Sequence, residues 1–406
     1  MKYFGLLIAV FCFLLSCKKD VQTVLQQGVW RGSMEVQEGH RLPFNFSLQK
    51  NESGYVMEVF NAQEVLTIDE ITMVNDSIYI KMPVFEGYIA ATYTENGIDG
   101  SFIKESLDRV VPFNAVYGDS TRFGLNNKPN TNVSGIWETA FSKDTEDAYM
   151  AKGIFKQEDG KVTGTFRTTT GDYRYLEGVL DGDSLKLSTF DGAHVFLFLA
   201  KVSDSTLQGT FYSGNHFKEP FVGVRNESYE LPDADSLTFI KEGYDKLTFS
   251  FPDAEGNIIS IEDPTYQNKV IIVQIMGTWC PNCLDESKFL VQYLKNNPHP
   301  DLEVLALAFE YAKTDSLAWK GISRLKERIG VSYPVLLAQV GTSNKETAND
   351  KLPMLNHILS YPTTIFIDKK GQVRKIHTGF NGPATGEKYE EFKNEFDAFV
   401  NSLLNE

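Results

Sequence analysis

The sequence predicts a multidomain protein in which two β-rich repeats, each an antiparallel barrel or sandwich, precede an α/β domain. Three observations predict this: residues 27–226 are filled by short strand patterns, motifs recur there at a fixed distance, and strands alternate with helices from Lys269 onward. The 406 residues allow two to four domains. With 42% hydrophobic and 23% charged residues, the composition is that of an ordinary globular protein, so we expect packed cores.

The protein is acidic, with a formal net charge of −15 and a sequence pI of about 5.0. An acidic surface repels the phosphate backbone of nucleic acids. We therefore expect no nucleic-acid partner.

Residues 1–16 are predicted to be a lipoprotein signal peptide. A positive start, Met1-Lys2, precedes an apolar run from Phe4 to Leu15, which is too short to span a bilayer comfortably. The run ends in Leu14-Leu15-Ser16-Cys17, which resembles a bacterial lipobox, where a small residue precedes the cysteine that is lipidated.

The lipobox implies lipidation at Cys17, with residues 17–26 as a polar tether. We then expect a protein of the bacterial cell envelope that faces the periplasm and is anchored to the inner or the outer membrane. The alternative is a plain secretory signal with an incidental cysteine.

The four cysteines restrict the chemistry further. Cys12 leaves with the signal peptide and Cys17 carries lipid, so only Cys280 and Cys283 remain as free thiols. An exported protein with a single cysteine pair is not a disulfide-stapled scaffold. The pair is therefore either redox-active or metal-binding.

The two β-rich repeats are residues 27–118 and 133–226, with residues 119–132 as their linker. Four short motifs recur in the same order at offsets of 107 to 109 residues, which indicates duplication of a whole domain. They start at Gly28 and Gly135, Asp76 and Asp183, Gly100 and Gly209, and Pro112 and Pro220.

Alternating apolar and polar residues predict half-buried antiparallel strands in each repeat, about eight of them. Trp30 and Trp137 open the two repeats and either close a barrel core or line a ligand mouth. The strands predicted in the first repeat are residues 43–50, 54–60, 77–83, 87–94, 97–103 and 110–117.

Residues 231–406 predict a βαβ unit followed by a ββα unit. Val270 to Met276 is a continuous apolar run, as expected for a strand buried on both faces. Asp315 is the predicted N-cap of the second helix. The other predicted elements are a hairpin at residues 249–261, strands at 303–309, 335–337, 363–367 and 372–378, and helices at 281–296, 315–329 and 387–404.

Trp279-Cys280-Pro281-Asn282-Cys283 lies where the buried strand ends and the first helix begins. A helix N-terminus stabilises negative charge, and the thiolate is the reactive form of cysteine. Pro281 suits the first turn, where its missing N–H would have no helical partner. We expect Cys280 to be the exposed attacking thiol and the more buried Cys283 to resolve the mixed disulfide.

Residues 277–283, Gly-Thr-Trp-Cys-Pro-Asn-Cys, and residues 361–368, Tyr-Pro-Thr-Thr-Ile-Phe-Ile-Asp, are followed by Gly371. Together they resemble the TlpA/ResA-like thiol–disulfide oxidoreductases, membrane-anchored thioredoxin-like proteins of the bacterial envelope used in cytochrome c maturation and general thiol reduction. The resemblance covers about residues 245–406 and not the β-rich half. It implies a thioredoxin fold and a redox disulfide between Cys280 and Cys283.

The resemblance also assigns roles near the dithiol. Pro362 matches a proline that is cis and faces the disulfide, and Glu286 matches a carboxylate that helps proton transfer. Gln274 stands where thioredoxins have a buried, titrating aspartate, which favours Glu286 as its substitute; an exposed helical glutamate without a role is the alternative. The residues expected to contact substrate are Trp279, Pro281, Tyr361 and Pro362.

The expected activity is reduction of protein disulfides in the envelope, with electrons from an upstream thiol donor; the direction is implied by the resemblance alone. The alternative function is binding of a ligand or partner by the β-rich half, with the α/β domain as an accessory. A zinc site would need a second pair of ligands, and His357 and His377 lack ligand spacing, so we expect no metal and no cofactor.

Overall fold

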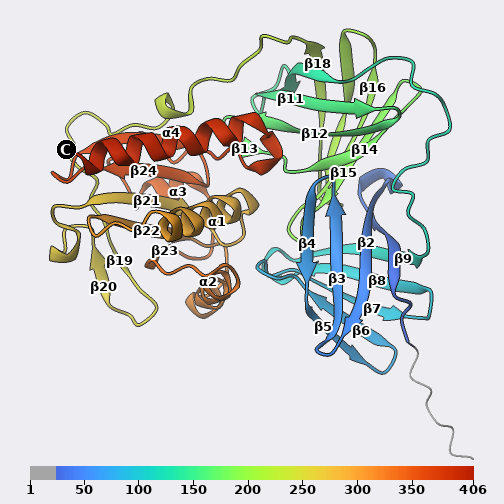
Figure 1. Cartoon of the computed structure of the whole chain (residues 1–406), viewed down its shortest axis with the longest axis horizontal. Coiled ribbons are helices and arrows are strands. Elements are labelled where there is room, and N and C mark those ends of the chain that lie inside the picture. Colours follow the sequence, from blue (N-terminus) through green and yellow to red (C-terminus); the bar gives the residue numbers. More distant parts are fainter. Residues whose placement is uncertain (1–23) are drawn as a thin grey trace, which may run out of the picture.

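The computed structural model describes residues 24–406 and shows two β-rich domains, here the first and second barrel, with the α/β domain beside them (Figure 1). The predicted signal peptide and the predicted lipidation site Cys17 lie outside the described residues. Within the described part of the chain, no helix is both long and apolar enough to cross a bilayer.

The first barrel is one antiparallel sheet of nine strands in the order β4-β3-β2-β1-β9-β8-β7-β6-β5, so it is nearly closed, with β4 and β5 at its edges. All six predicted strands form. β4 and β5 lie outside the predicted strands because Ile68 is their single fully buried side chain. The strands are β1 Gly28–Glu35, β2 Arg41–Asn51, β3 Gly54–Asn61, β4 Glu64–Ile68, β5 Glu70–Val74, β6 Ser77–Lys81, β7 Tyr88–Tyr93, β8 Gly97–Lys104 and β9 Arg109–Tyr117.

The second barrel repeats this plan in the order β11-β10-β18-β17-β16-β15-β14-β12-β13, and an additional pairing between β11 and β12 closes it. In both barrels the first strand pairs with the last, which confirms the predicted duplication. The strands are β10 Gly135–Phe141, β11 Tyr149–Glu158, β12 Lys161–Thr168, β13 Gly171–Asp172, β14 Leu176–Asp181, β15 Ser184–Phe190, β16 Val195–Val202, β17 Thr206–Ser213 and β18 Phe217–Arg225.

Trp30 and Trp137 occupy equivalent places at the starts of the two barrels. Both side chains are 0% exposed. Their indole N–H groups donate to the carbonyl oxygens of Gln26 and Val133, at 3.1 and 2.8 Å. They therefore close the barrel cores, and the alternative that they line ligand mouths is wrong.

The α/β domain is built on a five-stranded sheet in the order β23-β22-β21-β24-β25, with β21, β22 and β23 parallel. All seven residues of β21 are buried, as its continuous apolar run predicts. α1 and α4 pack together through Phe289, which lies against Phe392 and Phe396. The elements are β19 Ser250–Pro252, β20 Ile258–Ser260, β21 Val270–Met276, α1 Pro281–Asn296, β22 Leu302–Phe309, α2 Asp315–Ile329, β23 Val335–Gln339, α3 Lys345–Asn349, β24 Thr363–Ile367, β25 Val373–Thr378 and α4 Glu387–Leu404.

The N-cap of α2 is Thr314 and not the predicted Asp315. The Thr314 hydroxyl accepts a hydrogen bond from the backbone N–H of Leu317, which satisfies one of the free donors of the first turn. Asp315 is the first residue of the helix, where its negative charge interacts favourably with the positive end of the helix dipole.

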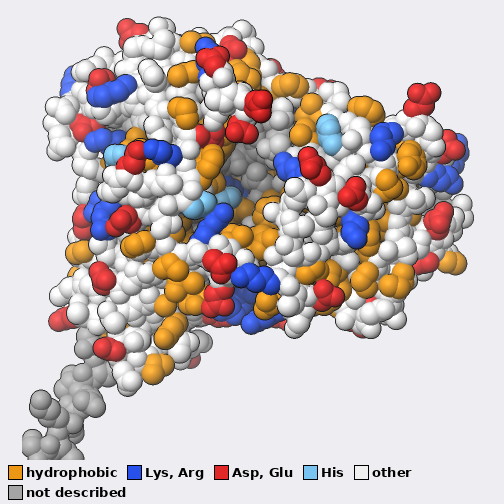
Figure 2. Space-filling model, turned by 180° about the vertical axis from the view of Figure 1, so that it is seen from behind, with side chains coloured by type: hydrophobic (Ala, Val, Ile, Leu, Met, Phe, Trp, Pro, Cys, Tyr) orange, Lys and Arg blue, Asp and Glu red, His pale blue; other side chains and the backbone are white. Residues whose placement is uncertain are grey.

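The α/β domain contacts both barrels. Arg324 of α2 donates to the carbonyl oxygen of Met82 in the first barrel at 2.6 Å, and Arg167 of the second barrel donates to the side chain of Asn381 at 2.9 Å. The back of the molecule is hollowed between the β-rich half and the α/β domain (Figure 2). Acidic and basic side chains alternate over this face, so the negative net charge is not gathered there into one patch.

Candidate active site

Cys280 and Cys283 lie at the junction of β21 and α1, and both are free thiols. Cys280 is the N-cap of α1, and its Sγ accepts a hydrogen bond from the backbone N–H of Cys283 at 3.2 Å. Pro281 fills the first helical position, as expected. This geometry directs a helical N–H group at the Cys280 sulfur and favours its thiolate.

The expectation that Cys280 is exposed is wrong. Cys280 is 7% exposed and Cys283 is 0% exposed, so the predicted order of burial holds, but both thiols are covered. The Cys280 Sγ–H donates to the carbonyl oxygen of Tyr361 at 3.4 Å. A segment of the second barrel also contacts Asn282, between the two cysteines. A contact with another domain cannot be predicted from the local motif.

Burial raises the pKa of the Cys283 thiol well above its ordinary value, and the neighbouring Cys280 adds to this effect. Cys283 therefore carries its proton at neutral pH. It needs a base before it can act as a nucleophile.

The four residues predicted to contact substrate surround Cys280. The Tyr361–Pro362 peptide bond is cis. Trp279 donates its indole N–H to the carbonyl oxygen of Phe309 at 2.9 Å and lies edge-on to Tyr361, with 5.4 Å between ring centroids. Trp279 is half-buried, whereas Pro281, Tyr361 and Pro362 are buried.

Glu286 is 1% exposed, so the alternative of an exposed helical glutamate is wrong. Its carboxylate accepts hydrogen bonds from Gln274 Nε2 and Thr364 Oγ1, both at 2.7 Å. Burial raises the pKa of Glu286 to about 7, although the two hydrogen bonds oppose this shift. The structure thus places a group that titrates near neutral pH one helical turn beyond Cys283, beside the non-titrating Gln274.

Glu310 is a second buried carboxylate near the dithiol, and it is not among the residues predicted from the sequence. It follows β22 directly and is 2% exposed. Its carboxylate accepts from the backbone N–H of Thr278 at 2.8 Å and from the Thr278 hydroxyl at 2.7 Å, and burial raises its pKa to about 7. The sequence did contain a signal for Glu310: a carboxylate directly follows an apolar strand, at the edge of the sheet where β21 also ends.

No cluster of three His, Cys, Asp or Glu side chains suited to a metal ion occurs within residues 24–406. The site in this part of the chain consists of a dithiol, two buried carboxylates and an aromatic wall. These groups support thiol–disulfide exchange, with proton transfer close to Cys283.

A family model and two curated relatives agree with this chemistry. Residues 241–392 match the Redoxin family. The chain is 25% identical over 140 residues to thioredoxin-like protein YneN of Bacillus subtilis, an alignment that covers 34% of this chain and 73% of YneN. It is 26% identical over 140 residues to thiol-disulfide oxidoreductase ResA of Bacillus subtilis, covering 34% and 69% of the two chains. A putative thiol:disulfide interchange protein DsbE from Chlorobium tepidum aligns with a TM-score of 0.30 at 15% identity, over 40% of this chain and 99% of its own.

Proposed function

Because the α/β domain is a thioredoxin-like redoxin domain of the thiol–disulfide oxidoreductase type, we propose that this chain reduces protein disulfides in the bacterial envelope through Cys280 and Cys283. The observation that carries the proposal is the Cys280 sulfur at the N-terminus of α1, with the N–H of Cys283 at 3.2 Å. The helix terminus favours the thiolate that attacks a disulfide.

The exchange takes place in two steps. The Cys280 thiolate attacks one sulfur of the substrate disulfide, so that a mixed disulfide forms, the substrate S–S bond breaks and one substrate thiolate leaves. Cys283 then loses its proton and attacks the Cys280 sulfur. The Cys280–Cys283 disulfide forms, and the second substrate thiolate leaves. Two electrons pass to the substrate, and an upstream thiol donor returns the pair to the dithiol.

Glu286 is the base that the second step requires. The Cys283 thiol is protonated because it is buried. Among the carboxyl groups of α1, Glu286 is the one nearest to Cys283 that is not hydrogen-bonded to a cation. Its pKa of about 7 lets it hold a proton or release one near neutral pH, which suits a general base. Gln274 and Thr364 fix the orientation of its carboxylate.

The reduction potential of the Cys280–Cys283 pair tests the direction of the reaction. We expect a value below about −250 mV, near that of thioredoxin, when the chain is equilibrated with dithiothreitol or glutathione buffers and the pair is scored by peptide mapping. A value above about −180 mV would make the protein an oxidant or an isomerase and would reject the proposed direction. A cysteine pair that these buffers do not interconvert between dithiol and disulfide would reject the oxidoreductase proposal altogether.

We propose further that Cys17 carries the lipid that anchors the protein, because it follows the apolar run from Phe4 to Leu15 and a small residue, Ser16. Cys17→Ser is expected to move the protein from the membrane fraction to the soluble fraction and to abolish incorporation of a labelled fatty acid. Cys12→Ser, within the predicted signal peptide, is the matched control and should change neither. Membrane attachment that survives Cys17→Ser would contradict the proposed anchor.

A further inference from the structure

A turn of the second barrel lies on the active-site end of the α/β domain. It joins β12 to β13 and, with the start of the following segment, spans residues 168–174; we call it the cover hairpin. Ser360 donates its hydroxyl to the carbonyl oxygen of Thr170 at 2.7 Å, and Asn282 donates its amide to the carbonyl oxygen of Asp172 at 3.2 Å. Asn282 lies between the two cysteines, and Ser360 precedes Tyr361, whose carbonyl oxygen accepts from the Cys280 thiol.

The cover hairpin also reaches the loop after β25. The backbone N–H of Gly382 donates to the Asp172 carboxylate at 2.7 Å. The two segments are so close that a methyl group on Gly379 would lie 3.0 Å from the carbonyl oxygen of Thr169. A methyl group on Gly171 would collide with the side-chain nitrogen of Asn282. This spacing leaves no room for a second polypeptide between the hairpin and either Asn282 or the loop after β25.

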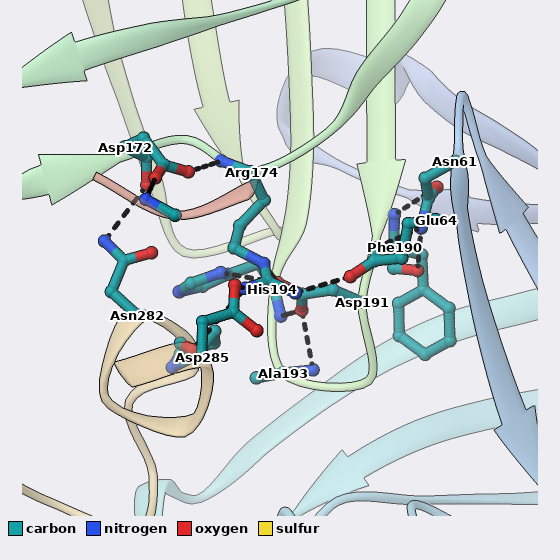
Figure 3. Close-up of polar contacts among 12 residues, drawn as sticks. Asn61, Glu64, Asp172, Arg174, Phe190, Asp191, Ala193, His194, Asn282 and Asp285 are labelled. Carbon is teal, nitrogen blue, oxygen red and sulfur yellow. Dashed lines mark hydrogen bonds and ion pairs between the residues drawn. The ribbon is translucent and has the colours of Figure 1, made fainter. Parts of the chain in front are cut away.

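Arg174 holds the base of the cover hairpin in place (Figure 3). Its side chain is 5% exposed and pairs with Asp285 of α1, with Asp191 of the second barrel at 3.5 Å, and with Glu64 of the first barrel. The contacts of the hairpin with the α/β domain are thus ion pairs and hydrogen bonds. Polar contacts of this kind are typical of domain interfaces that separate, because the charges regain water when they part.

We propose that the cover hairpin is an internal occupant of the substrate face, which a protein disulfide reaches only when the hairpin moves away. This inference rests on the proposed function, since it concerns access of substrates to Cys280. The 7% exposure of Cys280 is the expected consequence of the closed arrangement. The second barrel then determines how often the dithiol is open, because only the open fraction reacts with a large substrate.

Gly171→Ala tests the cover, with Gly54→Ala as the matched control. Gly171 has φ +137° and its methyl would strike Asn282, whereas Gly54 has φ +130° and nothing lies within 4 Å of its methyl. Both substitutions therefore strain a barrel turn, but only the first forces the Asn282 amide or the hairpin to move, and either movement breaks the hydrogen bond from Asn282 to Asp172. The full chain is reduced, and the alkylation rate of Cys280 is measured by peptide mapping with iodoacetamide and with a maleimide that carries a long polyethylene glycol chain.

In the Gly171→Ala variant, we expect Cys280 to be alkylated about tenfold faster by the bulky maleimide, while its rate of alkylation by iodoacetamide changes by less than about twofold. In Gly54→Ala, both rates should equal those of the unmodified chain. No acceleration would overturn the proposal, and so would equal acceleration of the two reagents, which would indicate a more reactive thiol and not a wider opening. If Gly171→Ala does not fold, Asn381→Ala removes the hydrogen bond to Arg167 and should give a smaller rise with the same preference for the bulky reagent.

Alkylation needs neither a substrate disulfide nor an electron donor. A dithiol without a measurable reduction potential would therefore reject the proposed function and leave the test of the cover intact. A reducing potential together with unchanged alkylation would reject only the cover.

Discussion

Cys280→Ser is expected to abolish reduction of a protein disulfide, with a loss of at least about a thousandfold, because a serine hydroxyl at the start of α1 does not supply the thiolate that attacks sulfur. The measurement is the rate of insulin reduction by the full chain, with dithiothreitol as the electron donor. The Cys280 side chain is small and its hydrogen bonds are to the Cys283 N–H and the Tyr361 carbonyl, both of which a hydroxyl can also meet. The variant should therefore fold normally.

Cys283→Ser is the matched variant for the second step. Attack by Cys280 remains, but the mixed disulfide can no longer be resolved from within the chain. The variant should accumulate as a covalent complex with its substrate, which is visible on a non-reducing gel and is released by dithiothreitol. A covalent complex trapped by Cys280→Ser and not by Cys283→Ser would reverse the two assigned roles.

The local chemistry of the site could be predicted because its residues lie in one short segment. The apolar run from Val270 to Met276, followed by Cys-Pro-Asn-Cys, predicts a strand, a helix start and a dithiol between them, and the structure has β21 and α1 at these residues. Amphipathic spacing likewise predicts α4 over Glu387–Leu404. Local periodicity carries this information, so distant parts of the chain are not needed.

The burial of the site could not be predicted, because it depends on residues far apart in the chain. Asn282 meets Asp172, and Arg174 pairs with Glu64 and Asp285, through contacts that no local pattern encodes. Glu310 reaches Thr278 only because β22 lies parallel to β21 in the sheet. The contact of the Cys280 thiol with the carbonyl oxygen of Tyr361 also joins distant parts of the chain, and a local pattern does not encode it either.

Glu286→Gln is expected to have two separable effects, the first on stability. Burial holds the pKa of Glu286 at about 7, against an ordinary value of 4.5, so the folded protein binds an extra proton between these values. The contribution of this group to stability is full below about pH 4.5, falls as the pH rises through 7, and is then lower by about 3 kcal/mol. The glutamine side chain of the variant does not titrate. The free energy of unfolding of the variant, relative to the unmodified chain, should therefore rise between pH 5 and pH 8, as measured by urea denaturation.

The second effect of Glu286→Gln is on the rate. Without a carboxylate to accept the Cys283 proton, resolution of the mixed disulfide should slow by about a hundredfold near neutral pH, and the loss should shrink at high pH, where the thiol ionises without help. Glu310→Gln is the control, because Glu310 has the same raised pKa but its carboxylate is bound by Thr278, which precedes the dithiol in the chain, whereas Glu286 follows Cys283 in α1. It should reproduce the pH-dependent gain in stability with a much smaller loss of rate. Equal rate losses in the two variants would show that any buried carboxylate near the site suffices and would remove the proton-transfer role from Glu286.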